Sequence, residues 1–529
     1  MTLLPFLVVT GFGAVASLLF RSRPAAAWAI GFVALAAAVL TAILIRPNEA
    51  IIIGGGGLAT TAYLRLFLVL ASTVALLLAI VGEATGVRQE APAASLGILA
   101  SSALALSLPD ARAAVLAATA GGAFGALVAL APAAGRSGAT VGTRVLRATA
   151  VAGTMAIAAT AWIGRDLSQL AAQPIVFGLA YLAFALAVAI RFGAIPVHTW
   201  AARLTEAVPE TALPLVTAIG PAALAVVALA WADASVAPLL LDLGSVRSVV
   251  LSVAVASIVL ASFAALIQDD IDHIVGYAIV GDAGVVMLAI AALDPGAWAP
   301  ARTWLLAFVV VRSAFAAWAA ATRATFGTGR VDGLRGWLVR SPLLAVVLGL
   351  VILGSIGWPG LAAASARGAL VDRVFDGPLE LFVLIGTLSP VVYYARLIAV
   401  GIERPGTQPR AEGWRPVITR IDMTDVRAWL ARTWSQNRLP SATGGAGLLA
   451  LLALLVSAGA FGTTDAAAGL PPTLQVSVES FAPGEPVPPI ESGAPVESGA
   501  PASEEPIESS PVETPPPSVG PSFEPVATP

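Results

Sequence analysis

The chain of 529 residues lacks cysteine, and all 29 of its basic side chains are arginines, so it also lacks lysine. The absence of cysteine excludes disulfides, thiolate chemistry and metal sites with cysteine ligands. The absence of lysine excludes side-chain amines, which can release their proton when burial lowers their pKa. A GC-rich genome accounts for such a composition, but the chemical consequence is the same whatever the cause: every arginine is expected to keep its proton.

Charge is scarce as well: 12% of the residues are charged and 58% are hydrophobic, whereas a soluble domain is about 25% charged. Runs of roughly 17 to 25 apolar residues can cross a bilayer. We therefore predict an all-α polytopic membrane protein with about fourteen transmembrane spans. The first is followed by "RSRP" rather than a small-residue cleavage site, so it is expected to be a retained helix. The predicted spans are Leu3–Phe20, Ala26–Ile45, Leu66–Val81, Ala94–Leu108, Ala113–Leu130, Ala148–Ile163, a broken segment Ile175–Ala202, Leu213–Ala230, Val249–Ile267, Ile274–Leu293, Trp304–Ala321, Leu343–Ile356 with an extension to Leu370, Leu379–Val400 and Ala446–Phe461.

The arginines of the connecting loops predict the orientation of these spans. One set of alternate loops is rich in arginine and the other set is poor, and arginine-rich loops remain in the cytoplasm. We expect this multi-pass protein in the cell inner membrane with both termini outside the cytoplasm, although one loop predicted to be cytoplasmic reads "QDDIDH". The basic set holds Arg21, Arg23, Arg136, Arg144, Arg147, Arg323, Arg330, Arg335, Arg340 and the arginines from Arg404 to Arg438.

Two segments lie outside the spans. The stretch "DMTDVRAWLARTW" has one apolar face, which indicates an amphipathic helix at the cytoplasmic interface or, alternatively, a solvated linker helix. The end of the chain is rich in Pro, Ser, Glu and Gly, which favours a disordered tail. The predicted organisation is residues 1–90 with three spans, 91–400 as a transmembrane core, 401–445 as an arginine-rich cytoplasmic loop, 446–463 as the last span and 464–529 as the tail.

The segment "RFGAIPVHTW" interrupts the broken seventh span with a charge and two helix-breaking residues. Arg191 stands at the break, Pro196 removes a backbone donor, and His198 follows. A break within a membrane is tolerated where protein or water supplies partners for the freed backbone groups, and an imidazole can exchange a proton near neutral pH. The alternative is that Arg191 extends to the membrane surface and His198 is a packing residue.

Further charges follow near or within later spans, where they usually face a partner or a wet cavity. Asp282 and Arg312 are on consecutive spans and could pair. Arg367 follows a second interruption, "GSIGWPGLAAASARG", so two broken helices each carry a cation near the break, as in ion carriers with repeated halves. The titratable candidates for a proton pathway are His198, Glu206, Glu210, Asp272, His273 and Asp282, and the fixed intramembrane charges are Arg191, Arg312 and Arg367.

Three motifs together resemble the antiporter-like membrane subunits of respiratory complex I and of multisubunit cation/proton antiporters. The stretch "RFGAIPVHTWAARLTEAVPETALPLV" is similar to the family segment in which a lysine precedes "PFHxW". "IQDDIDHIVGYAIVGDAG" resembles "Q.DiKRllAYSSI.h.G", and "GSIGWPGLAAASARGAL" with the later "YYARL" resembles "aGiP...GF..K" with "YY.R". The order and spacing fit, and the N-type subunit of NADH–quinone oxidoreductase is the most similar type.

This resemblance implies two inverted five-helix repeats, each with a broken helix, and a relay of buried lysines and a glutamate that moves protons. The chain departs from that relay at most positions. Two family lysines correspond to Arg191 and Arg367, a third falls at Gly220 or Pro221, and no acid lies in 117–120 where the family has its glutamate. Asp272 and His273 replace "KR", and Asp282 replaces a histidine, while the histidine of the first motif is kept as His198.

The resemblance implies a non-redox membrane subunit of a NADH–quinone oxidoreductase-type complex that contributes to proton translocation. In that case, its partners are other membrane subunits and the lipid bilayer, with no nucleic acid. Two alternatives stay open: a degenerate structural paralogue without transport, and a subunit of a cation/proton antiporter. The sequence contains no phosphate-binding loop, haem ligands or quinone-site signature, so we expect no cofactor, no metal and no catalytic residue in this chain.

Overall fold

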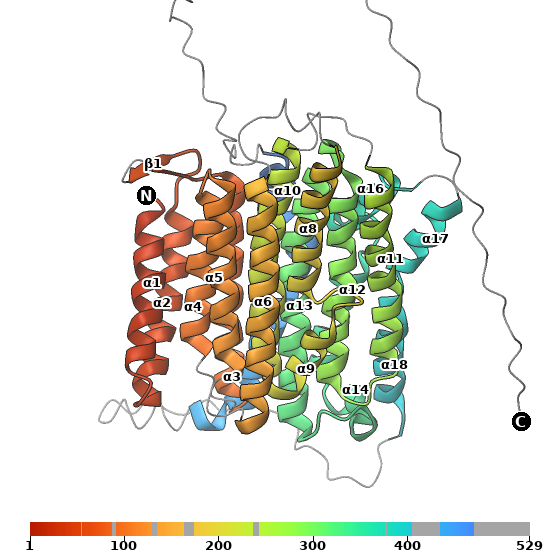
Figure 1. Cartoon of the computed structure of the whole chain (residues 1–529). Coiled ribbons are helices and arrows are strands. Elements are labelled where there is room, and N and C mark those ends of the chain that lie inside the picture. Colours follow the sequence, from red (N-terminus) through yellow and green to blue (C-terminus); the bar gives the residue numbers. More distant parts are fainter. Residues whose placement is uncertain are drawn as a thin grey trace, which may run out of the picture. The chain divides into compact units, whose positions relative to one another are not determined.

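The computed structural model describes residues 1–53, 56–86, 91–129, 135–162, 174–235, 243–375, 378–404 and 434–469, all of which lie in one compact unit. Within these ranges, 11 helical segments are long and apolar enough to cross a membrane, and three shorter apolar helices accompany them. The chain is an all-α polytopic membrane protein, as predicted (Figure 1). The exact number of spans and the two inverted repeats remain predictions.

The N-terminal part comprises α1 (Leu4–Leu19), α2 (Pro24–Leu44), α3 (Ala62–Ala84), α4 (Ala91–Ser107), α5 (Ala111–Ala129) and α6 (Gly135–Trp162). A short antiparallel hairpin of β1 (Ala50–Ile53) and β2 (Gly56–Ala59), with Ala50 opposite Ala59, joins α2 to α3 and was not predicted. Arg144 and Arg147 lie within α6, so their assignment to a loop was wrong. A helix can continue past the hydrocarbon layer into water, and the apolar run alone does not reveal its full length.

The middle of the chain comprises α8 (Pro174–Phe192), α9 (Thr199–Ala207), η2 (Glu210–Ala212), η3 (Leu215–Ile219), α10 (Gly220–Ser235), α11 (Gly244–Leu266) and α12 (Ile271–Ala292). η3 is a π-helical turn that leads directly into α10. Pro221, at the start of α10, has no N–H and its ring crowds the preceding turn, and the wider π turn accommodates both effects. The helical run Glu210–Ser235 is therefore one candidate span, and every residue of its most apolar window is buried.

The last part comprises η5 (Pro295–Ala297), α13 (Trp298–Phe326), η6 (Val331–Leu334), α14 (Trp337–Arg340), α15 (Pro342–Ile356), α16 (Ala362–Asp372), α17 (Pro378–Thr387), α18 (Pro390–Ile402), α20 (Arg438–Ser457), η7 (Ala460–Gly462) and α21 (Thr463–Ala468). The thirteenth predicted span is divided between α17 and α18 just before Pro390. Thr463 and Ala467 are fully buried residues of α21, so the prediction that the disordered tail begins at residue 464 was wrong. The rest of the tail and most of the predicted amphipathic helix lie outside the described residues.

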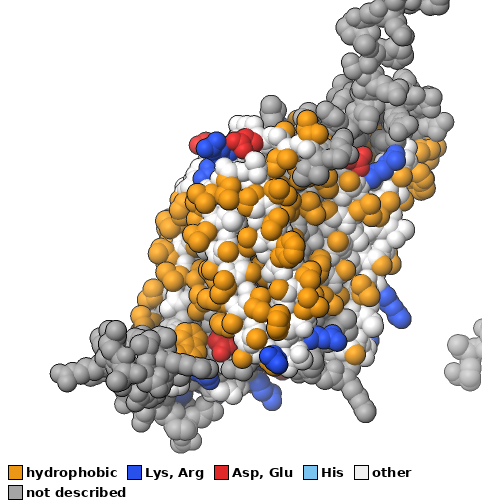
Figure 2. Space-filling model, turned by 90° about the vertical axis from the view of Figure 1, so that its left-hand side faces the viewer, with side chains coloured by type: hydrophobic (Ala, Val, Ile, Leu, Met, Phe, Trp, Pro, Cys, Tyr) orange, Lys and Arg blue, Asp and Glu red, His pale blue; other side chains and the backbone are white. Residues whose placement is uncertain are grey.

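α13 is the central helix of the bundle. The most apolar window of its span is entirely buried, and it packs against α3, α12, α15, α16, α20 and α21. The outward faces of peripheral helices instead carry apolar side chains; Phe12 of α1 is 73% exposed and Ile175 of α8 is 78% exposed. Figure 2 shows such side chains spread over one face of the unit, with charges gathered toward its ends. That distribution suits a surface solvated by lipid.

A chain of contacts places Met1 and Gly469 at the same end of the bundle. The amide of Arg46, which precedes the hairpin, donates to the carbonyl of Met1 at 3.0 Å. Tyr63, at the start of α3 after the hairpin, donates to the carbonyl of Arg302 at 3.2 Å. Arg302 in turn donates to the carbonyl of Gly469 at 2.8 Å. The first and last described residues therefore lie on the same side of the membrane-spanning helices (Figure 1).

Both predicted helix breaks are present. α8 ends at Phe192. The next residue, Gly193, has a φ of +66°, a conformation that favours glycine. The indole of Trp200 donates to the carbonyl of Ile190 at 2.8 Å, and the amide of Ile195 donates to Ser257 Oγ at 3.0 Å, so side chains serve backbone groups freed by the break. Between α15 and α16, Gly357 and Gly360 have φ values of +71° and +97°.

Candidate functional site

Arg191 lies inside the protein at the end of α8. Its side chain is 2% exposed, and Nη1 donates to Thr149 Oγ1 on α6 at 3.0 Å. A Cβ added to Gly122 of α5 would come within 2.8 Å of the guanidinium, so the absence of a side chain at that position makes room for it. This burial contradicts the alternative in which Arg191 extends to the membrane surface. The described residues give Arg191 no carboxylate partner.

His198 precedes α9, and it shares a narrow pocket with His273, the other histidine of the chain. The imidazole of His198 lies 6.1 Å from the ring of Tyr277, measured between centroids. Its Nδ1 atom is buried and has no hydrogen-bond partner among the described residues. A packing histidine with satisfied nitrogens is therefore a poor description of this residue. The pocket is lined by His198, Ala202, Thr205, His273, Gly276, Tyr277 and Val280.

Asp282 and Arg312 form the ion pair that their positions on consecutive spans suggested. Arg312 Nε lies 2.5 Å from Asp282 Oδ2, and the two side chains are 0% and 7% exposed. Tyr393 and Tyr394 accept from Arg312 Nη1 at 3.2 Å each, and Ser355 accepts from Nη2 at 3.1 Å. The guanidinium is thus surrounded by oxygen atoms from α12, α15 and α18, which compensates for its removal from water.

Arg367 lies on α16, directly after the second break. It is 5% exposed, and its Nη2 donates to the carbonyl of Ile356, the last residue of α15. The guanidinium carbon is also 5.8 Å from the centre of the Trp304 ring, a cation–π distance. Its Nε atom has no partner among the described residues. The cation therefore joins the two halves of the broken helix through a backbone carbonyl.

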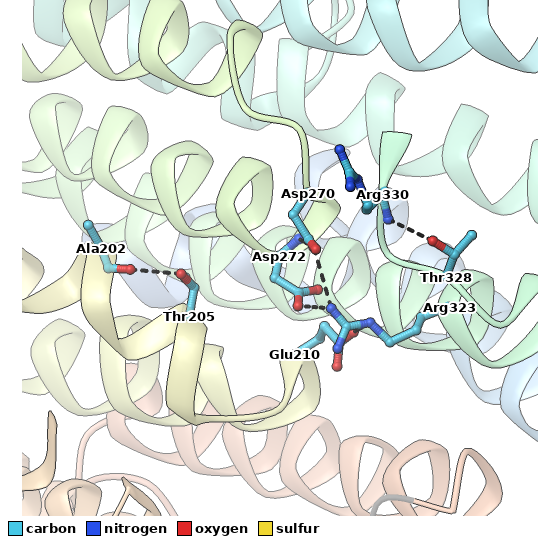
Figure 3. Close-up of polar contacts among 8 residues, drawn as sticks. All are labelled: Ala202, Thr205, Glu210, Asp270, Asp272, Arg323, Thr328 and Arg330. Carbon is cyan, nitrogen blue, oxygen red and sulfur yellow. Dashed lines mark hydrogen bonds and ion pairs between the residues drawn. The ribbon is translucent and has the colours of Figure 1, made fainter. Parts of the chain in front are cut away.

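Three carboxyl groups meet Arg323 near the carboxyl end of α13 (Figure 3). Arg323 Nε lies 2.8 Å from Glu210 Oε1, and Nη2 contacts both Asp272 and, at 3.4 Å, Asp270. Arg323 Nε and Glu210 Oε1 are close enough for an ion pair, but neither atom has a hydrogen-bond partner in the described part of the chain. Glu210 and Asp272 are 2% and 6% exposed. We refer to these four residues as the Arg323 cluster.

Glu206 is the one titratable candidate that the structure places at the surface. It pairs with Arg203 at 2.7 Å, and the two side chains are 44% and 57% exposed. The cluster and the histidine pocket lie close together, because Asp272 and His273 are neighbours in the first turn of α12. Asp282 lies ten residues further along the same helix, which is about 15 Å at the α-helical rise.

Several partners of the buried charges could not be predicted from the sequence. Arg323 was assigned to a basic loop, more than fifty residues from the carboxylates it contacts. Thr149 beside Arg191 and Ser355 beside Arg312 are ordinary small residues of apolar helices, and nothing in their sequence context marks them. The tyrosine pair of the "YYARL" motif was the available signal for the site around Arg312, since two adjacent phenols in an apolar span need polar partners.

Residues 149–392 match the model of the family described as NADH:quinone oxidoreductase/Mrp antiporter, transmembrane. The match covers less than half of the chain and shows that this segment is similar to that family. Arg191, Arg312, Arg367, the histidine pocket and the Arg323 cluster all lie within this antiporter-like segment, as do both helix breaks.

Curated relatives match a stretch of similar length. NADH-quinone oxidoreductase subunit N 1 of Streptomyces griseus is 28% identical over 241 residues, 45% of this chain and 48% of the relative. Subunit N of Halorhodospira halophila is 26% identical over 248 residues, 45% of this chain and 49% of the relative. The aligned part of the chain thus spans about half the length of these relatives.

Solved structures extend the similarity of fold beyond the antiporter-like segment. A chain of respiratory complex I from Thermus thermophilus with bound NADH superposes with a TM-score of 0.65 and 16% identity, covering 89% of this chain and 99% of that one. A chain of the Mrp complex from Dietzia sp. has a TM-score of 0.66 and 17% identity, with coverages of 89% and 97%. At this identity the likeness establishes the fold.

Proposed function

We propose that this chain is a membrane subunit of a NADH–quinone oxidoreductase-type complex and contributes to proton translocation driven by electron transfer in partner subunits. The observation that carries the proposal is the burial of Arg191 and Arg367 beside helix breaks of an antiporter-like segment, with the Asp282–Arg312 pair inside the bundle. Buried charges in a membrane protein are costly, and they usually mark an ion pathway. The names of the curated relatives support this type of complex over an antiporter.

The division of labour between the charges follows from their chemistry. The arginines stay protonated and act as fixed charges. His198, His273, Glu210 and Asp272 supply titratable groups near one end of α12, and Asp282 supplies one further along it. A proton moving along this helix from Asp272 to Asp282 would need water between them, because no hydrogen bond or ion pair of the described residues joins these two acids. We propose that electron transfer in the partners drives hydration of this polar axis.

The orientation and the organisation of the chain are part of the proposal. The end of the bundle that carries the Arg323 cluster also carries the arginine-rich connections, so we place it at the cytoplasmic side of the inner membrane. Met1 and Gly469 are then outside. Residues 91–400 form the antiporter-like core, with 1–90 as three additional spans, 401–445 as a cytoplasmic loop and 446–463 as the last span. The partners would be sister membrane subunits.

The assembled complex, reconstituted in proteoliposomes, tests the proposal. We expect His198→Ala to lower the number of protons moved per NADH oxidised, because the imidazole is a titratable group of the pathway. Asp282→Asn should do the same where the complex still assembles. Glu206→Gln is the matched control, since its exposed pair lies away from the buried groups. Unchanged pumping in both test variants, at normal electron transfer, would refute the proposal.

The same vesicles test the two alternative functions. A cation/proton antiporter would require sodium or potassium for proton movement, which is checked by omitting each ion, and one solved neighbour is a chain of an Mrp complex. A degenerate structural paralogue would leave the proton-to-electron ratio unchanged in every variant of this chain. Arg191 and Arg367, at positions where the family places lysines, are the observation that favours this second alternative.

A further inference from the structure

The Arg323 cluster contains more negative charge than its cation can offset. Three carboxyl groups contact one guanidinium in the described part of the chain, so full ionisation would leave a charge of −2. Ionisation of Asp270 costs the least of the three, because its side chain is 33% exposed. This side chain also caps α12 by accepting a hydrogen bond from the amide of Asp272 at 3.1 Å. Glu210 and Asp272 are both more than nine-tenths buried and depend on the same guanidinium.

The contacts of Asp272 point to a missing hydrogen. Its Oδ2 atom faces Arg323, whereas its Oδ1 atom is buried without a hydrogen-bond partner among the described residues. The Asp272 and Glu210 carboxyl groups lie close together, because both contact the same Arg323 guanidinium. Two carboxylates have only acceptor atoms, so this proximity is repulsive unless one of the two groups carries a proton.

We infer that Glu210 and Asp272 together bind one proton, which Asp272 Oδ1 donates to the Glu210 carboxylate while Asp272 Oδ2 accepts from Arg323. With this proton the two buried acids and the guanidinium are electrically neutral as a group, and the unpartnered oxygen gains a partner. That the pair binds a proton does not depend on the proposed function. A role of this proton in translocation rests on the proposed function.

Other charged groups lie on the elements packed around the Arg323 cluster. α12 contributes Asp270 and His273, α13 contributes Arg323, and α9 contributes the exposed pair of Arg203 and Glu206. α3, which packs against η2, ends with Glu83 in its last turn. The chain after α13 reaches Asp270 through a backbone bridge at Arg330, whose side chain points away from the carboxyl groups in Figure 3. Arg323 is thus the cation that forms ion pairs with Glu210 and Asp272 in the described part of the chain.

Infrared spectroscopy of the full-length chain in lipid vesicles tests the inference without a transport assay. At neutral pH we expect a carbonyl band of a protonated carboxyl group that shifts in D2O and disappears in both Asp272→Asn and Glu210→Gln. Glu206→Gln and Asp270→Asn, as controls, should keep the band. A band that survives in either test variant, or the absence of any such band from the unmodified chain, would overturn the inference.

Thermal stability gives a second, independent readout. The amide of Asp272→Asn can donate to Glu210 as the protonated acid does, so its unfolding midpoint at neutral pH should equal or exceed that of the unmodified chain. A variant that unfolds well below it, or does not fold, would show that Asp272 is an ionised partner of Arg323 and would contradict the shared proton. Loss of pumping in the reconstituted complex is a separate outcome, which bears on the proposed function and leaves the infrared band unaffected.

Discussion

The buried ion pair of Asp282 and Arg312 gives the sharpest prediction of stability. Asp282→Asn keeps the shape of the side chain and removes its charge, so Arg312 is left as a buried cation whose remaining acceptors are neutral. Breaking a buried pair from one side costs about 3–5 kcal/mol. The two tyrosine hydroxyls and Ser355 continue to accept from the guanidinium, so we expect a loss near the lower end, about 3 kcal/mol.

Reversible unfolding in mixed detergent micelles measures this loss as a change in the free energy of unfolding. Asp294→Asn is the control, because Asp294 pairs with Arg373 at 2.5 Å with side chains 36% and 46% exposed. Exposed pairs contribute about 0–1 kcal/mol. A double variant, Asp282→Asn with Arg312→Met, should recover most of the loss, since it removes the unpaired cation. If Asp282→Asn falls within about 1 kcal/mol of the unmodified chain, as the control should, the assignment of a charge-dependent pair is wrong.

Two further predictions use the same unfolding measurement. Gly122→Ala should lower the free energy of unfolding by about 1–3 kcal/mol, because the added Cβ would overlap the Arg191 guanidinium. The control Gly349→Ala, whose Cβ meets nothing within 4 Å, should be neutral or stabilising. Equal effects of the two variants would show that the space at Gly122 is not needed. The hydrogen bond from Arg373 lowers the pKa of Asp294, so the stability that ionised Asp294 contributes is complete above the ordinary aspartate pKa and is lost as the pH falls through the lowered value. The unmodified chain should therefore lose a small part of its free energy of unfolding between about pH 5 and pH 2, and Arg373→Gln should abolish this loss. An acid profile that is the same in both proteins would contradict the assignment.

The membrane fold and the helix breaks could be predicted from the sequence because their causes are local. Long apolar runs have few stable states in lipid other than helices. Gly193 with Pro196, and Gly357 with Pro359, interrupt those runs by their own backbone restrictions. The pair of Asp282 and Arg312 was predictable for a related reason, since each is a charge within an apolar span and the spans are consecutive.

The rest of the candidate site depends on tertiary contacts that leave no periodic signal. Arg323 was predicted to lie in a basic loop because arginine at the end of a span usually faces water, yet packing of α13 against η2 brings it to Glu210. Glu206 and Glu210 are four residues apart in sequence and appeared equivalent. α9 ends between them, however, which leaves Glu206 at the surface and Glu210 buried.

α13 carries Arg302, Arg312 and Arg323 at intervals of about 15 Å along its length, each fixed by a different partner. A shift of this helix along its axis by a single turn would detach all three at once, from the Gly469 carbonyl, from Asp282 and from the acids at the far end. α13 is therefore expected to stay fixed during transport, and any movement should be confined to the interrupted helices around it. Spin labels on α9 or α16 would then report movement, while a label on α13 would stay at rest.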